Sequence, residues 1–211
     1  ACSFDAVVSM ATRVEGLLAA LGRRRALARV VDIRQRAAQR VGHWGHSGYI
    51  AATAAIDRLI DAGSFTEAVD ATARLLQRAQ QAGEAAYAGA DYDLTMCLIY
   101  SGRALRLSGR AVEALGTIVD AEQRLSRVAP ACASEATAMT SLCITERADC
   151  LCALGRLDEA AQTYEEAIRS TEQRGDNRQV AVAKAQVGNL RLHQLSYPEA
   201  LTAYSEARQT F

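Results

Sequence analysis

The sequence has no excess of charge of either sign, and this absence argues against whole classes of function. Its 24 lysine and arginine residues balance 24 aspartate and glutamate residues, so the formal net charge is zero. Nucleic-acid-binding domains usually carry a basic excess, so we expect no nucleic-acid partner. No apolar run reaches the roughly 20 residues that span a bilayer, and no basic segment followed by an apolar stretch opens the chain. We therefore expect neither a membrane segment nor a signal peptide.

Signatures of the common enzyme classes are also missing. The chain has no G-x-S-x-G, no H-E-x-x-H and no phosphate-cradling glycine loop. Its three histidines, His43, His46 and His193, are too scattered for an acid–base constellation. His43 and His46 could supply two metal ligands, but no cysteine lies nearby, so we expect neither a metal nor another cofactor. Trp44 between them is expected to pack over the first helix pair or to dock a partner as an exposed aromatic anchor.

The composition favours a folded protein with reduced thiols. Half of the residues are hydrophobic, which is more than a disordered chain carries. The six cysteines do not indicate a disulfide framework, because such frameworks are typical of small secreted domains with weak cores. We expect mostly buried thiols and a cytoplasmic location. A metal or redox role stays open for Cys143, Cys150 and Cys152, which fall on one predicted helix.

Four segments of the chain repeat one short pattern. In each, an alanine follows a glutamate, and in three of them a glycine stands five residues before the alanine. Glycine readily takes the positive φ that ends a helix, and a glutamate in the next first turn meets the positive end of the helix dipole. Each segment therefore predicts a turn between two helices. The repeat alanines, 46, 46 and 40 residues apart, are Ala68, Ala114, Ala160 and Ala200.

Residues around each repeat alanine predict that the two helices pack closely. Ser196 and Asp158 are expected N-caps, and Pro198 is tolerated in a first turn. Four and seven residues after the alanine, positions on one helical face recur, as in Tyr164 and Ala167. A small residue stands twelve residues before the alanine in three copies, which lets the first helix touch the second. These small residues are Gly102, Ala148 and Gly188.

The small residue, the alanine, the aromatic and the second alanine together resemble the tetratricopeptide-repeat (TPR) family, over residues 48–211. Family members repeat every ~34 residues, so the longer period here predicts extended helices or longer links. The resemblance implies an all-α fold, an α-solenoid in which antiparallel helix pairs coil as a right-handed superhelix. We expect about four TPR-like repeats in one continuous solenoid, with further repeats beyond Phe211. Residues 1–47 are expected to form a degenerate helix pair and linker, with helices over Phe4–Leu21 and Arg24–Arg40 and a link over Val41–Tyr49.

In such a stack, the first helices of the pairs line a concave groove that suits a bound peptide or helix. Arg103 and Arg106 could hold a partner's carboxylate there through paired hydrogen bonds. Alternatively, Asp57, Arg103 and Asp149 alternate in sign and form a ladder between adjacent helices, in which an exposed pair contributes about 0–1 kcal/mol. The candidate partner-binding residues of the groove, eleven or eight residues before a repeat alanine, are Asp57, Arg103, Arg106, Asp149 and Asn189.

Two functions are consistent with this groove, and neither is enzymatic. The first is a protein–protein interaction scaffold that binds a partner protein or peptide, as a module of a larger bacterial multidomain protein; this origin follows from the resemblance alone. The alternative is a sensor domain that closes on a short signalling peptide. Chaperone-binding TPR domains hold a C-terminal carboxylate with a clamp of lysines and asparagines, and this set is not found here.

Overall fold

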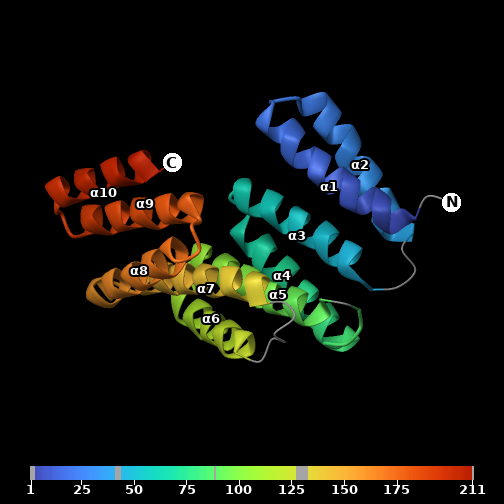
Figure 1. Cartoon of the computed structure of the whole chain (residues 1–211). Helices are drawn as coiled ribbons and strands as arrows, with labels where there is room; N and C mark the ends of the chain where they lie inside the picture. The colour runs from blue at the N-terminus through green and yellow to red at the C-terminus, as the bar shows by residue number, and fades with distance from the viewer. Residues whose placement is uncertain (1–2, 41–43, 88, 127–132, 211) are drawn as a thin grey trace. The chain divides into compact units, whose positions relative to one another are not determined.

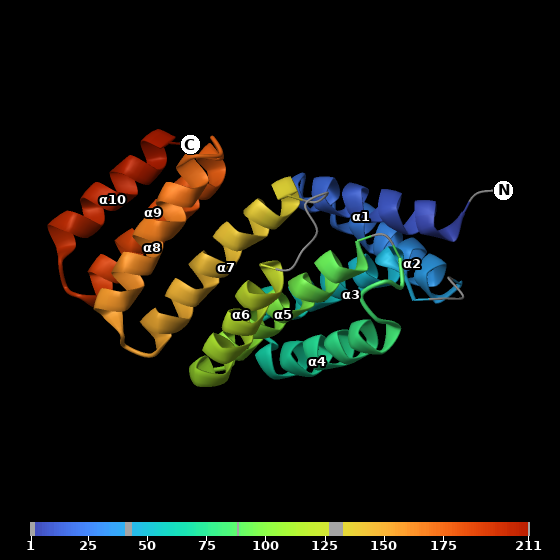
Figure 2. The same cartoon turned by 60° about the horizontal axis from the view of Figure 1, so that its bottom comes forward.

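The computed structural model describes residues 3–40, 44–87, 89–126 and 133–210, and all regular structure in these residues is α-helical. The prediction of an all-α fold is therefore confirmed for the described residues (Figures 1 and 2). The helices are α1 (Phe4–Ala20), α2 (Arg24–Arg40), α3 (His46–Asp61), α4 (Phe65–Ala82), α5 (Ala90–Leu107), α6 (Ala111–Leu125), α7 (Ala133–Ala153), α8 (Leu157–Glu172), α9 (Asn177–His193) and α10 (Tyr197–Thr210).

Each odd-numbered helix forms a hairpin with the helix that follows it, and the same three-residue turn closes each hairpin. In the turn between α7 and α8, the amide of Arg156 donates to the carbonyl of Leu151 over 2.9 Å, five residues back along the chain. This bond is the mark of a Schellman turn, which requires a positive φ at the residue before the donor. Gly155 supplies it with φ 72°, whereas Leu195 adopts φ 60° in the last hairpin. The corresponding bonds elsewhere join Arg23 to Leu18, Ser64 to Leu59, Arg110 to Leu105 and Ser196 to Arg191.

The repeat alanines occupy equivalent places in the four hairpins from α3 to α10. Each is the fourth residue of the second helix of its hairpin and is at most 1% exposed. The small residues twelve positions earlier explain why the helices approach so closely. A Cβ atom on Gly102 would lie 2.5 Å from Cδ1 of Ile118, and one on Gly188 would lie 2.6 Å from the ring of Tyr204. The predicted close contact within each pair is thus confirmed for these two hairpins.

Some predicted helix ends are correct and two are wrong. Helices α1 and α2 lie within one residue of their predicted ranges, and Pro198 lies in the first turn of α10. Asp158 is not an N-cap, because the turn makes Arg156 the N-cap of α8 and leaves Asp158 inside the first turn. The predicted link up to Tyr49 is too long, since α3 begins at His46. Gly48 lies inside this helix, and a Cβ atom there would lie 3.1 Å from the ring of Trp44.

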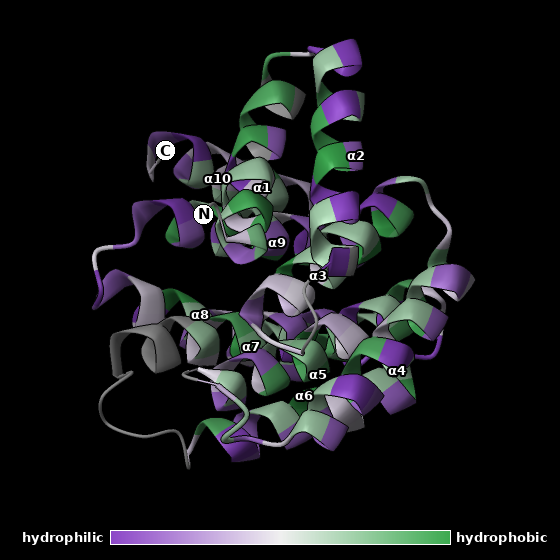
Figure 3. Cartoon of the chain, turned by 90° about the vertical axis from the view of Figure 1, so that its right-hand side faces the viewer, coloured by the Kyte–Doolittle hydropathy of each residue, from purple (hydrophilic) through white to green (hydrophobic). Residues whose placement is uncertain are grey.

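The chain forms two compact units, residues 1–100 and 101–211, whose boundary falls within α5. In the first unit, α1 and α2 both pack against α3. Figure 3 shows alternating hydrophilic and hydrophobic bands along α2, as expected for a helix with one packed face. The core of this unit contains Tyr49, Ile56, Leu75, Ala79, Leu94 and Cys97.

The second unit has its own core, formed by α7, α8 and α9. Its buried residues are Ala148, Leu151, Ala160, Tyr164 and Leu190. Along this unit each helix from α6 to α10 packs against the next one in the chain, which is the packing of a helical repeat. None of the helices in the described ranges carries an apolar stretch long enough to cross a bilayer.

Candidate functional site

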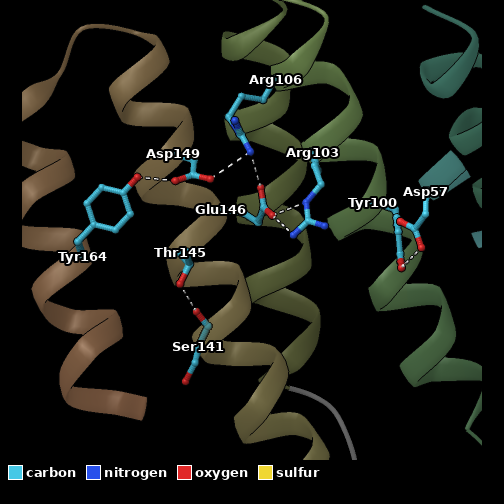
Figure 4. A network of polar contacts seen from close by, with 9 residues as sticks. All are labelled: Asp57, Tyr100, Arg103, Arg106, Ser141, Thr145, Glu146, Asp149 and Tyr164. Atoms are coloured by element: carbon cyan, nitrogen blue, oxygen red, sulfur yellow. Dashed lines mark hydrogen bonds and ion pairs between the residues drawn. The ribbon is translucent and has the colours of Figure 1, made fainter. Parts of the chain in front are cut away.

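Helices α5, α7 and α8 bring five polar side chains of the second unit together. We call Arg103, Arg106, Glu146, Asp149 and Tyr164 the polar array (Figure 4). Arg103 Nε donates to Glu146 Oε1 over 2.6 Å, and Arg106 Nη2 lies 3.2 Å from Glu146 Oε2 and 3.0 Å from Asp149 Oδ2. The Tyr164 hydroxyl donates to the other oxygen of Asp149. Each carboxylate therefore joins two neighbours, and the array crosses three helices.

Burial makes the polar array an integral part of the helix packing. The side chain of Glu146 is 3% exposed and that of Asp149 is 11% exposed. Burial raises the pKa of Asp149 above its ordinary value, although Arg106 and the Tyr164 hydroxyl both act in the opposite direction. Burial also lowers the pKa of Arg106, but the charges of Asp149 and Glu146 outweigh it and raise that pKa overall. Two guanidinium groups thus face two carboxylates in a low-dielectric setting, where such attractions are strong.

A polar contact within the first unit follows the same spacing along the repeat as a contact of the polar array. Tyr100, fourteen residues before Ala114, donates its hydroxyl proton to Asp57, which lies eleven residues before Ala68, over 3.4 Å. In the second unit Glu146 lies fourteen residues before its repeat alanine, and its partner Arg103 lies eleven residues before the preceding one. The two contacts therefore obey one rule: position −14 of a first helix meets position −11 of the previous first helix.

Asn189 also uses the position eleven residues before its repeat alanine. Its Oδ1 accepts a hydrogen bond from the Tyr204 hydroxyl over 2.6 Å, and its Nδ2 donates to Gln186 over 2.7 Å. Tyr164 contacts Asp149 with the same separation of fifteen residues along the chain. The aromatic of the repeat thus holds the polar side chain of its own hairpin in a fixed orientation.

A groove of about 860 Å³ runs over this surface of the second unit. It brings together three of the five predicted partner-binding residues, Arg106, Asp149 and Asn189. Nε of Arg106 is buried and has no hydrogen-bond partner among the described residues. The remaining lining residues are Leu107, Cys152, Ala153, Tyr164, Gln186, Leu190, Leu192 and His193.

The predicted charge ladder is only partly correct. Asp149 forms an ion pair with Arg106, and the charge of Arg103 also acts to lower the pKa of Asp149. Arg103 also pairs with Glu146, a partner that the sequence analysis missed. The signal was present, since Glu146 and Tyr100 both stand fourteen residues before a repeat alanine. Recognising it required knowing how far one first helix is shifted along the next.

Trp44 and the cysteines take structural places. Trp44 packs against the core that α3, α4 and α5 form in the first unit, and the guanidinium of Arg78 lies 4.8 Å from its ring centre. Cys97, Cys143 and Cys150 are free and fully buried, as predicted, and burial raises the pKa of each thiol to about 12. Cys2 and Cys132 lie outside the described residues. Among the described side chains, no three metal-ligating groups gather at one place.

Comparison with protein-family models gives no match, and comparison with curated proteins gives none either.

Proposed function

We propose that this chain is a TPR-like binding module, whose stacked hairpins form an α-solenoid with right-handed superhelical twist and hold a partner protein or peptide against the first helices. The repeated Schellman turns and the four equivalent alanines support the TPR-like character. The observation that carries the binding function is the groove of about 860 Å³ over α5, α7 and α9. Pockets of this size are common at ligand sites, and this one combines apolar and polar walls.

The polar array gives the groove a fixed chemical pattern. Glu146 and Asp149 both contact Nη2 of Arg106, so the guanidinium is already oriented before a partner binds. Its unpaired Nε is a donor that a partner's carbonyl or carboxylate would satisfy. Leu192, 41% exposed on α9, offers an apolar contact beside it. A peptide with an apolar side chain next to an acceptor group fits this combination best.

The test is selection of peptides followed by matched variants. Peptides selected from a random display library on the full chain would be synthesised, and their Kd measured by fluorescence polarisation. Leu192→Glu should weaken binding at least about tenfold, or about 1.4 kcal/mol, because it places a carboxylate inside the groove. Leu201→Glu is the control, since Leu201 is 68% exposed on α10 and does not line the groove. Equal effects of the two substitutions, or none, would refute binding in this groove.

A sensor of short signalling peptides is the second candidate. The presence of both Arg106 and Asn189 in the lining of one groove favours it. A sensor has to change shape when it binds. Small-angle X-ray scattering with and without a selected peptide separates the two functions: a clear decrease in radius of gyration supports the sensor, and an unchanged radius supports the scaffold.

A further inference from the structure

The first unit contains a buried arginine with an unused hydrogen-bond donor. The side chain of Arg34 on α2 is only 1% exposed. Its Nε donates to Glu15 Oε1 over 2.5 Å, and its Nη1 donates to the carbonyl of Ala51 over 2.9 Å. Its Nη2 is buried and has no hydrogen-bond partner among the residues that the structure describes. A buried charged donor of this kind is costly unless an acceptor satisfies it.

Arg34 lines a cavity of about 480 Å³ together with residues of α3 and α4. The other charged residues of its lining are Arg58 on α3 and Arg78 on α4, and none of the described lining residues is acidic. Two carboxylates lie near these arginines outside the lining. Glu15 pairs with Arg34 and has its Oε2 3.6 Å from Arg58 Nη1, and the charge of Asp57 also acts on Arg58. Three guanidinium groups beside two carboxylates leave the cavity with an excess of about one positive charge. Burial and the charge of Arg34 lower the pKa of Arg58, although the charges of Glu15 and Asp57 act in the opposite direction.

The third arginine of the cavity lining, Arg78, packs against an aromatic ring. The guanidinium of Arg78 lies 4.8 Å from the ring centre of Trp44. Gly48 lies close to the same ring, since a Cβ atom built on it would be 3.1 Å from the nearest ring atom. A cation–π contact orients a guanidinium and leaves its N–H donors available. Between the arginines, the cavity is lined by small apolar residues such as Ala51, Ala52 and Ala55. The cavity therefore has room for a compact group at its charged centre.

We propose that this cavity is an oxyanion-binding site, which takes a carboxylate or phosphate group on a small ligand or at the end of a chain. The oxyanion would accept from Nη2 of Arg34 and face Arg58 and Arg78. Arginine is the residue best suited to such groups, because its planar donors match their oxygens. The site lies in the first unit and the groove in the second, so each of the two proposals can fail without the other.

The single tryptophan of the chain gives a direct readout of this site. In two-dimensional ¹⁵N–¹H NMR spectra of the full chain, the one indole N–H signal belongs to Trp44. The chain would be titrated with succinate, inorganic phosphate or neutral succinamide at constant ionic strength. We expect a saturable shift of this signal with succinate or phosphate, and none with succinamide. The oxyanion that binds more tightly identifies the ligand class.

Matched variants decide whether the arginines are responsible. Arg78→Gln and Arg58→Gln should each weaken binding at least about fivefold, whereas Arg74→Gln, on the exposed face of α4 and outside the cavity lining, should change it less than about twofold. Circular dichroism of each variant checks that the helices are intact. The proposal is overturned if neither anion gives saturation, if succinamide shifts the signal equally, or if Arg74→Gln weakens binding as much as Arg78→Gln.

Discussion

Arg103 on α5 and Glu146 on α7 are 43 residues apart in the chain, and the guanidinium Nε of one lies 2.6 Å from the carboxylate of the other. The contact matters because Glu146 is almost fully buried and also faces Arg106. It fixes how far one first helix is shifted along its neighbour.

Glu146→Ala should reduce the free energy of unfolding by about 3 kcal/mol, since removing one partner of a buried ion pair leaves uncompensated charge. Glu166→Ala is the control. Glu166 pairs with Arg147 at 2.9 Å but is 50% exposed, so its loss should cost less than about 1 kcal/mol. Urea denaturation followed by circular dichroism measures both. Similar small losses for the two would show that the polar array contributes little.

Leu195→Gly should stabilise the protein by about 1 kcal/mol, because Leu195 adopts φ 60° and a side chain in this region costs about 1–2 kcal/mol. Little burial is lost, as Leu195 is 71% exposed. The reverse change, Gly155→Leu at φ 72°, should destabilise by a similar amount. Thermal unfolding compares the two, and a lower melting temperature for Leu195→Gly would contradict the prediction.

Gly102→Ala should destabilise by about 1–3 kcal/mol, because its new methyl group would overlap the fully buried Ile118. Gly116→Ala on α6 should instead stabilise by up to about 1 kcal/mol, since alanine favours a helix and nothing lies within 4 Å of its Cβ. Shortening the clashing side chain in Gly102→Ala/Ile118→Val should recover part of the loss. No recovery in urea denaturation would mean that the cost has another origin.

The buried thiols should resist alkylation at pH 8. Raising a thiol pKa from 9.0 to about 12 reduces its thiolate fraction roughly a thousandfold. Cys97, Cys143 and Cys150 should therefore react with iodoacetamide at least about a hundredfold more slowly in the native chain than in urea. Mass spectrometry of the digested protein reports each site separately. Rapid native labelling of any of the three would place that thiol at a surface or in an opening segment.

Asp93 should make stability depend on pH in the acid range. Burial raises its pKa above the ordinary value of 3.8, although hydrogen bonds from Tyr87 and His46 act in the opposite direction. The folded state then binds the proton more tightly than the unfolded state, so the free energy of unfolding should fall as pH rises from about 3.8 through the raised pKa. Asp93→Asn should lack this part of the slope. An unchanged difference between the two proteins from pH 3 to pH 7 would refute it.

The hairpins of this protein can be predicted from its sequence because their determinants are local. A glycine that takes positive φ and a glutamate and alanine a few residues later define one helix end and the next helix start. This pattern correctly located the turns at Gly63, Gly109 and Gly155, and through its glutamate and alanine also the turn at Leu195. The small residue at Gly102 likewise revealed which faces of two neighbouring helices touch.

Which side chains meet across helices that are distant in sequence was decided only by the tertiary structure. Glu146 reaches Arg103 and Arg106 because α5 and α7 pack with one particular shift, and a helical period fixes the face of a residue but not this shift. The cavity around Arg34 forms because Glu15, α3 and α4 all pack around this one arginine. Nothing in the sequence distinguishes Arg34 from the chain's other arginines. Burial, which sets the energetic weight of a charge, exists only once these helices are assembled.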